Sequence, residues 1–265
     1  MSEYICCAEL AEHLKQIHKG DTVYVVSDVL ELAKQAREHG DRFDRDVFLN
    51  ALQEKIGKEG TLLIPTFNWD FCKGIAFDYY RTPCRTGALG TAALKRNDFV
   101  RTKHPIYSFA VWGKDQKELF DRDEVNSFGE NSIFDYMYRK DAKALVIGLD
   151  AMDGLSFMHH VEQMVGVPFR FEKTFVADYT DWNHETTQKE YTMYVRDLKM
   201  DAKENTKHFS QILEDLNISR TRMLNGIPFR TVLMRQVYEL EAMDITFNDS
   251  RNLYIYKGQK EKDAD

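Results

Sequence analysis

Short apolar runs alternate with amphipathic stretches along the first two-thirds of the chain. Residues 22–26, 61–67 and 144–149 are rich in β-branched and aliphatic side chains and are bounded by turn-forming residues, which predicts three buried strands. Between the first two runs, residues 46–56 carry apolar side chains at helical spacing, and a glycine directly after them ends this helix. Strand and helix units in succession predict an α/β fold, with a parallel or mixed sheet covered by helices.

Weaker patterns complete the chain and change character in its last third. Helices are also expected over residues 6–18, 86–94, 133–138, 205–216 and 232–243, and strands over residues 109–112 and 253–256. Polar and apolar residues alternate in parts of 173–197, which predicts antiparallel strands. We expect a single domain over residues 1–265, with a more variable part over 173–257 and a charged tail over 258–265.

Polar side chains follow the predicted strands, at the edge where ligands of α/β sheets gather. Ser27 and Asp28 follow the first strand, and Thr66 lies at the end of the second. A loop that leads to His159 follows the third. A serine hydroxyl beside free backbone N–H groups can bind phosphate, and the alternative is a simple helix cap. The convergence of three strand ends favours a shared ligand site.

The segment after the third run carries the sharpest candidate chemistry. Ser156 is expected to cap a helix on which His159 and Glu162, three residues apart, share a face, while His160 points elsewhere. Histidine can take a proton near neutral pH, and a carboxylate beside it stabilises the imidazolium. The alternative is a helix start with two partly buried histidines. A zinc site would need a third ligand and usually two histidines four residues apart, so no metal is expected.

Two further segments carry candidate side chains. Residues 68–85 are rich in aromatic residues, including Trp69 and Tyr79, and either line a pocket or pack under a long loop. Pro105 restricts the backbone between His104 and Ser108.

Composition narrows the class of protein. Hydrophobic residues make up 43% of the 265 residues and aromatic residues 12%, as in an ordered globular protein. The net charge of −7 argues against nonspecific binding of nucleic acid or of an anionic membrane, and is compatible with an amine substrate. The four cysteines form no regular framework, as expected of thiols in a reducing cytosol. No signal peptide or membrane-spanning run is evident, so we expect a cytoplasmic protein.

Six groups of residues, in order, resemble one known family. They are Gly20-Asp-Thr-Val with Ser27, Glu59-Gly-Thr-Leu with Pro65-Thr-Phe67, Thr86-Gly-Ala-Leu, Arg101 with His104-Pro105, Ser108 and Gly113, Phe128-Gly129 with Ser132, and Asp153 with Ser156-Phe-Met-His159 and Glu162. On these residues, which span about two-thirds of the chain, it resembles the aminoglycoside 3-N-acetyltransferases of the antibiotic N-acetyltransferase family, distinct from the GNAT fold. The resemblance implies an α/β fold with a central mixed sheet and helices on both faces, and residues 1–172 would carry the coenzyme A and catalytic motifs.

The resemblance also implies roles for individual residues. His159 would be the general base, Glu162 its support, and the hydroxyl of Ser108 would lie near the thioester. The loop with Ser27 would hold the coenzyme A pyrophosphate, and residues 173–257 would shape the acceptor site. With these roles in view, Asp28, Thr66, His104 and Ser108 are further candidates for contacts with coenzyme A, and Asp153, Trp69 and Tyr79 are candidates for contacts with the acceptor. One departure stands out. The family commonly has His-Ser-Ser after its first strand, where this chain has Val26-Ser27-Asp28, and an acid beside a pyrophosphate is unfavourable.

The expected activity is transfer of an acetyl or short acyl group from acyl-coenzyme A to an amine of an aminoglycoside or amino sugar, by direct attack with a histidine base. Two alternatives remain: a nucleotide-linked amino sugar as acceptor, and a non-catalytic protein that binds coenzyme A. The first would need cations for a diphosphate, for which Arg170, Arg220, Arg222 and Arg230 are candidates; Asp28, Asp178, Asp181 and Glu185 would instead favour an ammonium. Self-association into a homo-oligomer is left open.

Overall fold

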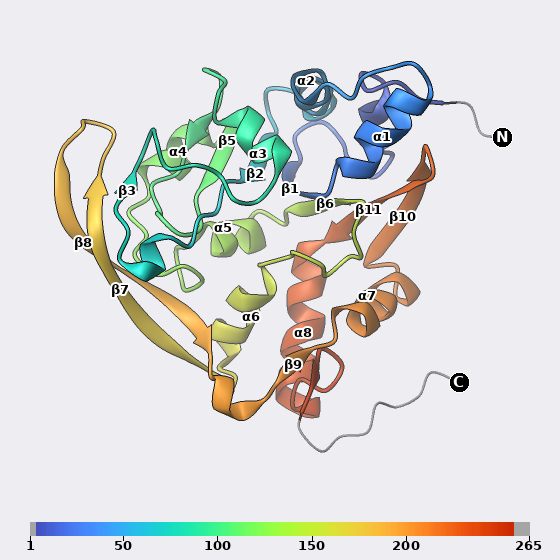
Figure 1. The fold of residues 1–265 in the computed structure, drawn as a ribbon. Helices are drawn as coiled ribbons and strands as arrows, with labels where there is room; N and C mark the ends of the chain where they lie inside the picture. Colours follow the sequence, from blue (N-terminus) through green and yellow to red (C-terminus); the bar gives the residue numbers. More distant parts are fainter. Residues whose placement is uncertain (1–3, 257–265) are drawn as a thin grey trace.

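The computed structural model describes residues 4–256. A seven-stranded sheet with the order β10-β11-β6-β1-β2-β5-β4 forms its centre (Figure 1). Its strands are β1 Thr22–Ser27, β2 Thr61–Pro65, β4 Val100–Arg101, β5 Phe109–Gly113, β6 Lys143–Ile147, β10 Ser219–Leu224 and β11 Ile227–Leu233. The three central strands β6, β1 and β2 are parallel, whereas the outer strands pair antiparallel. The expected mixed sheet is therefore confirmed.

Both faces of this sheet are buried, and that explains why its central strands are almost continuously apolar. Side chains alternate between the faces along β1: Tyr24 and Val26 belong to one apolar core, and Val23 and Val25 to the other. Helices cover both faces (Figure 1). They are α1 Leu30–Glu38, α2 Arg45–Ile56, α3 Ala88–Ala93, α4 Gln116–Asp121, α5 Ile133–Arg139, α6 Met158–Val165, α7 Thr206–Asp215 and α8 Met234–Asn248.

A long hairpin of β7 Arg170–Thr180 and β8 Thr186–Arg196 flanks this body, and the short strand β3 Phe77–Asp78 pairs with β7 (Figure 1). The strands β9 Lys203–Glu204 and β12 Tyr254–Ile255 pair with each other near the end of the chain. The short β9–β12 pair brings Tyr254 back towards α6 and therefore contributes to the site described below.

Several expectations were wrong in detail. Residues 6–18 form only a 3₁₀ turn at Leu10–His13, and Val232 belongs to β11 rather than to the following helix. The helix α1 and the β10–β11 hairpin had no expectation at all. The proposed division at residue 172 stays a prediction, and the charged tail at 258–265 lies outside the described residues. No helix within residues 4–256 is both long and apolar enough to cross a membrane.

Candidate active site

The parallel register brings the ends of β1 and β6 together. Ser27 lies opposite Ile147, and the backbone N–H of Asp28 donates to the Ile147 carbonyl at 2.9 Å. The next residue, Gly148, has a φ of +73°, and a Cβ there would lie 2.6 Å from the Asp28 carbonyl oxygen. Only glycine fits such a close approach of two backbones. Gly148 therefore allows the loop after β6 to lie directly against the loop after β1.

A cavity of about 640 Å³ opens at this edge of the sheet. Ser27 and the first turn of α1 form one wall, and Thr86-Gly-Ala at the start of α3 another. The Ser27 hydroxyl makes no cap bond to α1; within residues 4–256 it has no hydrogen-bond partner. Asp28 takes that position instead, because its Oδ1 accepts from the Leu30 N–H at 2.9 Å. The simple-cap interpretation of Ser27 was therefore wrong.

Three arginines that sequence reasoning missed complete the cavity. Arg37 lies in the last turn of α1, Arg45 begins α2, and Arg42 lies between the two helices. All three are exposed, and no carboxylate of the described chain forms an ion pair with them. Unpaired guanidinium groups suit phosphate oxygens. The only signal in the sequence was a cluster of arginines flanking the helix at 46–56.

The second feature of the site is the pair of His159 and Glu162 on α6. Nδ1 of His159 lies 2.9 Å from Oε2 of Glu162, and the His159 ring packs edge-on against Phe128. The Glu162 side chain is 1% exposed and that of His159 is 18% exposed. A carboxylate bonded to Nδ1 selects the tautomer with its proton there, which leaves Nε2 as the basic nitrogen. Nε2 has no hydrogen-bond partner among residues 4–256. The pair predicted from the three-residue spacing is confirmed.

Two residues that follow α6 in the chain, at the start of β7 and in β12, hold Glu162 in place. Nε of Arg170 lies 2.7 Å from Oε2, and the Tyr254 hydroxyl donates a hydrogen bond to Oε1. Burial alone would raise the pKa of Glu162, but the charge and hydrogen bond of His159, the Arg170 charge and the Tyr254 hydrogen bond together hold this pKa below its usual value. Glu162 is therefore an ionised carboxylate inside the protein.

A second buried acid lies behind this pair. Glu241 on α8 is fully buried, and neither of its carboxyl oxygens has a hydrogen-bond partner in the described part of the chain. Burial first, and then the charges of Glu162 and Asp244, raise the pKa of Glu241 well above its ordinary value. Glu241 is therefore held in its neutral, protonated form.

His160 has a structural role. It is 1% exposed, and its Nδ1–H donates to the Phe128 carbonyl at 2.6 Å. Its ring packs between those of Phe157 and Tyr238. The expectation that His160 points away from His159 is confirmed. Ser156 differs from its expectation, because α6 begins at Met158 without any side-chain cap.

The family role of Ser108 does not agree with its geometry. Its hydroxyl is fully buried, donates to the Thr66 carbonyl at 3.0 Å, lies 2.9 Å from the Thr66 hydroxyl and accepts from Nε of Arg101 at 3.1 Å. One O–H and two lone pairs are then all used, so no proton remains for an oxyanion. Thr66, also fully buried, is engaged in the same cluster. Both residues hold β2 and β5 together instead of facing the cavity.

His104 is likewise turned inward. Only 1% of it is exposed, its Nδ1 accepts from the backbone N–H groups of Ile106 and Tyr107, and its Nε2 lies 3.3 Å from the Ser127 hydroxyl. Burial lowers the pKa of His104 to about 3, so the ring stays neutral. With both ring nitrogens engaged, His104 shapes the loop after Pro105 and offers no group to coenzyme A.

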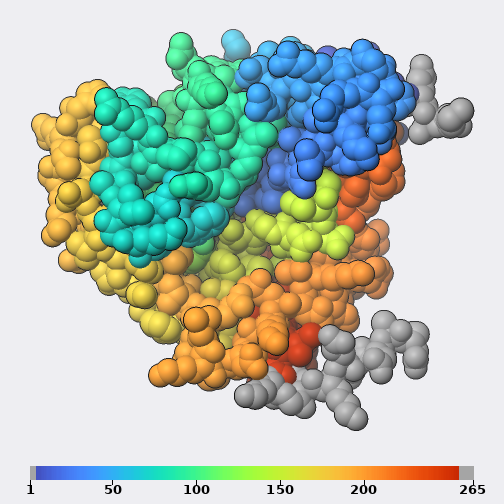
Figure 2. All heavy atoms as spheres, viewed as in Figure 1, coloured from blue at the N-terminus to red at the C-terminus, as the bar shows by residue number. Residues whose placement is uncertain are grey.

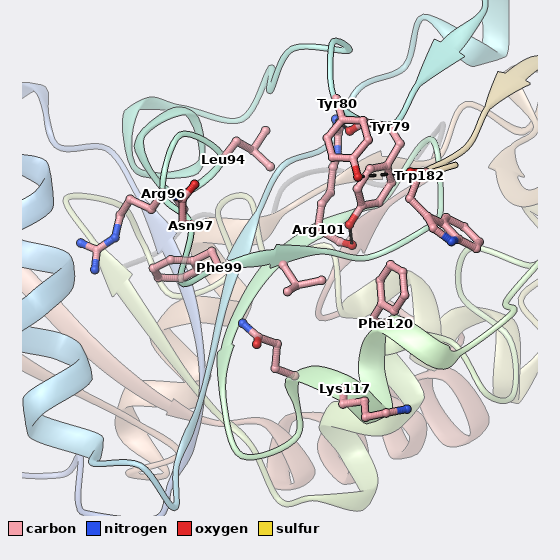
Figure 3. A pocket seen from close by; sticks show the side chains of 13 residues that line it. Tyr79, Tyr80, Leu94, Arg96, Asn97, Phe99, Arg101, Lys117, Phe120 and Trp182 are labelled. Atoms are coloured by element: carbon pink, nitrogen blue, oxygen red, sulfur yellow. Dashed lines mark hydrogen bonds between the residues drawn. The ribbon is translucent and has the colours of Figure 1, made fainter. Parts of the chain in front are cut away.

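The two aromatic candidates lie in different places. Tyr79 lines a separate cavity of about 570 Å³ with Tyr80, Phe120 and Trp182, at the outer edge of the sheet (Figure 3). Trp69 donates its indole N–H to the Tyr107 hydroxyl at 3.3 Å. The expected place of Tyr79 beside the acceptor is not supported, because sequence could not show which way the long loop folds. The role of Trp69 stays a prediction, since Tyr107 also packs against Phe128, the ring that contacts His159.

The pocket at His159 is smaller, about 260 Å³, and acidic. It is lined by Met152, Asp153, Gly154, Leu155, Ser156, Met158, His159, Glu204 and Thr206. Asp153 accepts from the Thr206 hydroxyl at 2.8 Å, which fixes its carboxylate at the start of α7. Figure 2 shows the surface hollowed between the N-terminal segment and the C-terminal third, with the segment leading into α6 exposed between them. Within residues 4–256, no group of histidine, cysteine and acidic side chains could hold a metal ion.

Solved structures share this fold. The aminoglycoside acetyltransferase AAC(3)-Xa superposes with a TM-score of 0.75 at 17% identity, covering 91% of this chain and 93% of that one. AAC-IIIb, in a binary complex with CoASH, superposes with a TM-score of 0.74 at 18% identity, covering 94% of this chain and 98% of that one. AAC-VIa bound to sisomicin superposes with a TM-score of 0.75 at 15% identity, covering 91% of this chain and 97% of that one. At such identities the likeness establishes the fold.

The family itself follows from the sequence model of aminoglycoside 3-N-acetyltransferases, which matches residues 37–243. This range contains the His159–Glu162 pair and Arg170, and it ends close to the end of α8. Because the match covers well over half of the chain, the protein belongs to the aminoglycoside 3-N-acetyltransferase family.

Proposed function

We propose that the protein transfers an acetyl group from acetyl-coenzyme A to an amine of an aminoglycoside or a similar cationic amino sugar, with His159 as the general base. The observation that carries this proposal is the imidazole of His159, whose Nδ1 is bonded to a buried carboxylate and whose other nitrogen is free at an acidic pocket. The family and the relative bound to CoASH support the choice of co-substrate.

The reaction needs an uncharged amine, since an ammonium group has no lone pair. Nε2 of His159 removes its proton, and Glu162 stabilises the imidazolium that forms. The amine nitrogen then bonds to the thioester carbonyl carbon, the carbon–sulfur bond breaks, and the leaving thiolate recovers the proton from His159, while the second proton that the nitrogen loses on becoming an amide passes to solvent. Direct attack is favoured over a cysteine intermediate, because burial raises the pKa of both Cys7 and Cys72 to about 11.

Coenzyme A would bind with its phosphates in the cavity beside Ser27. The Ser27 hydroxyl has no hydrogen-bond partner among the described residues. Three positive charges, those of Arg37, Arg42 and Arg45, match a pyrophosphate and a 3′-phosphate. Asp28 lies at the N-terminus of α1, where its carboxylate is stabilised by the helix dipole and accepts a hydrogen bond from the Leu30 N–H. We therefore assign Asp28 to the shape of the loop rather than to a phosphate contact.

The acceptor site favours a cation over a nucleotide-linked sugar. The pocket is lined by the carboxylates of Asp153 and Glu204, of which Glu204 is paired with Arg196, and by no arginine or lysine. Of the arginines considered for a diphosphate, Arg170 forms an ion pair with Glu162, and Arg230 is paired with Asp150 and Glu214. An ammonium-rich substrate would be attracted to such a pocket and a diphosphate repelled.

Release of the coenzyme A thiol from acetyl-coenzyme A, followed with a chromogenic disulfide, tests the proposal. We expect release that depends on an aminoglycoside such as sisomicin, with an acetylated product by mass spectrometry. Faster release with a nucleotide-linked amino sugar would support the alternative acceptor. Binding of coenzyme A without release for any amine would leave only the non-catalytic alternative.

A further inference from the structure

Glu162 lies at the centre of a buried cluster drawn from distant parts of the chain. Oε2 is shared by Nδ1 of His159 at 2.9 Å and Nε of Arg170 at 2.7 Å, and Oε1 accepts from the Tyr254 hydroxyl. Nη2 of Arg170 also lies 3.3 Å from the Tyr254 hydroxyl. Figure 1 shows α6 beside α8, with the start of β7 and β9 close to the end of α6. The carboxylate thus has hydrogen-bond partners on α6 and β12 and an ion-pair partner, Arg170, on β7.

We propose that Arg170 and Tyr254 are positioning residues that set the pH at which the His159–Glu162 pair takes up a proton. Arg170 is the principal determinant, since its charge lies against the oxygen that His159 also contacts. The inference rests on the proposed function, in which the unprotonated pair is the active form. Neither residue touches the substrates in this scheme; both act through Glu162.

The direction of the effect follows from the charges. A proton added to the pair, on either partner, brings a positive charge next to the Arg170 guanidinium in a buried site. Arg170 therefore opposes protonation. Tyr254 stabilises the ionised carboxylate through its O–H and so also opposes proton uptake. Without either group, the pair would hold its proton at higher pH and lose the free base under neutral conditions.

The other charged and titratable groups around the pair do not replace Arg170. They are Glu241 on α8, Tyr194 on β8, Glu204 on β9, which lies 3.6 Å from Nη2 of Arg170, and Asp153 in the pocket. Glu241 is neutral, Tyr194 bonds the Val167 carbonyl through its hydroxyl, and Glu204 is also paired with Arg196. Arg170 is the only one of the positively charged arginine and lysine side chains of residues 4–256 that contacts Glu162.

The chain contains a matched control. Arg196 is the direct cross-strand neighbour of Arg170 in the β7–β8 ladder, and it carries the same charge. It pairs with Glu204 and makes no contact with Glu162. Arg196→Gln therefore removes one positive charge from the same region without touching the pair, whereas Arg170→Lys keeps the charge on a different side chain.

Two measurements test the proposal. The first is the pH dependence of kcat/KM with acetyl-coenzyme A and sisomicin. The second is titration of the His159 ring protons by NMR in the free enzyme, assigned by their absence in His159→Gln from the signals of the chain's 8 histidines. For Arg170→Gln we expect the acid limb and the NMR midpoint to move up by roughly 1 to 2 pH units, and for Tyr254→Phe by about half a unit. Arg170→Lys and Arg196→Gln should remain near the wild type.

Each outcome has a meaning. No movement in Arg170→Gln, or an equal movement in Arg196→Gln, overturns the proposal. Should Arg170→Gln fail to fold, Tyr254→Phe decides, because it removes one hydroxyl and keeps the ring packed against Phe169. If the wild type acetylates no amine, the proposed function fails, while the NMR midpoints still show whether Arg170 controls the pair.

Discussion

Replacing the two neighbouring histidines of α6 separates catalysis from stability. His159→Ala removes the base but little packing, since this side chain is partly exposed and Glu162 keeps Arg170 and Tyr254 as partners. We expect turnover at pH 7 to fall by about two to four orders of magnitude. That corresponds to roughly 3–6 kcal/mol in the barrier, at about 1.4 kcal/mol per factor of ten. Affinity for coenzyme A should hardly change.

His160→Ala should instead lower stability and leave the general base in place. It leaves the buried Phe128 carbonyl without its donor at 2.6 Å, which costs about 1–3 kcal/mol. It also opens a cavity between Phe157 and Tyr238, for roughly another 2 kcal/mol. A total of about 3–5 kcal/mol lowers Tm by on the order of 10 °C for a chain of this size. His160→Asn, whose amide N–H can replace the lost donor, should recover part of this.

Both variants are measured by coenzyme A thiol release at 15 °C, well below the lowered Tm, and by calorimetry. The His159→Ala enzyme should regain part of its rate between about pH 7 and pH 9, because more of the amine is then uncharged. Equal losses of turnover in the two variants, or a larger loss in His160→Ala, would refute the assignment of the base.

Three further outcomes are expected. Ser27→Ala and Arg45→Gln should each weaken coenzyme A binding by about 1–2 kcal/mol in calorimetry and leave turnover at saturation nearly intact. An unchanged affinity would remove these residues from the cofactor site. Ser108→Ala should lower the free energy of unfolding in urea by about 1–3 kcal/mol, because Nε of Arg101 is left buried without an acceptor, while kcat stays close to that of the wild type. A large fall in kcat at unchanged stability would instead show that Ser108 takes part in the reaction. Glu241 keeps its proton when folded and loses it when unfolded above its ordinary pKa of 4.5, so wild-type stability falls as pH rises from there. Glu241→Gln should therefore be more stable than wild type at pH 8, with the difference vanishing towards pH 4. A variant that is less stable than wild type at pH 8 would contradict the assignment of Glu241 as a protonated acid in the folded protein.

Local features of this protein were determined by its sequence. A continuous apolar run such as residues 22–26 predicts a strand buried on both faces, because a half-exposed strand would alternate. The spacing of His159 and Glu162 places both on one side of a helix, since neighbours three apart share a face. Ser27 at the end of a parallel strand falls at the ligand edge for the same kind of reason. The resemblance of ordered motifs then named the family.

Only the tertiary structure decided which way side chains point at that edge and what surrounds them. Ser108 reaches the correct edge because β5 runs antiparallel to β2, yet Arg101 and Thr66 use its hydroxyl from inside. Tyr254 lies 92 residues from Glu162 along the chain, and the two meet because β12 folds back towards α6. A hydrogen bond across that separation leaves no periodic signal. The site therefore combines a base that local spacing specifies with a support that depends on how the C-terminal third packs.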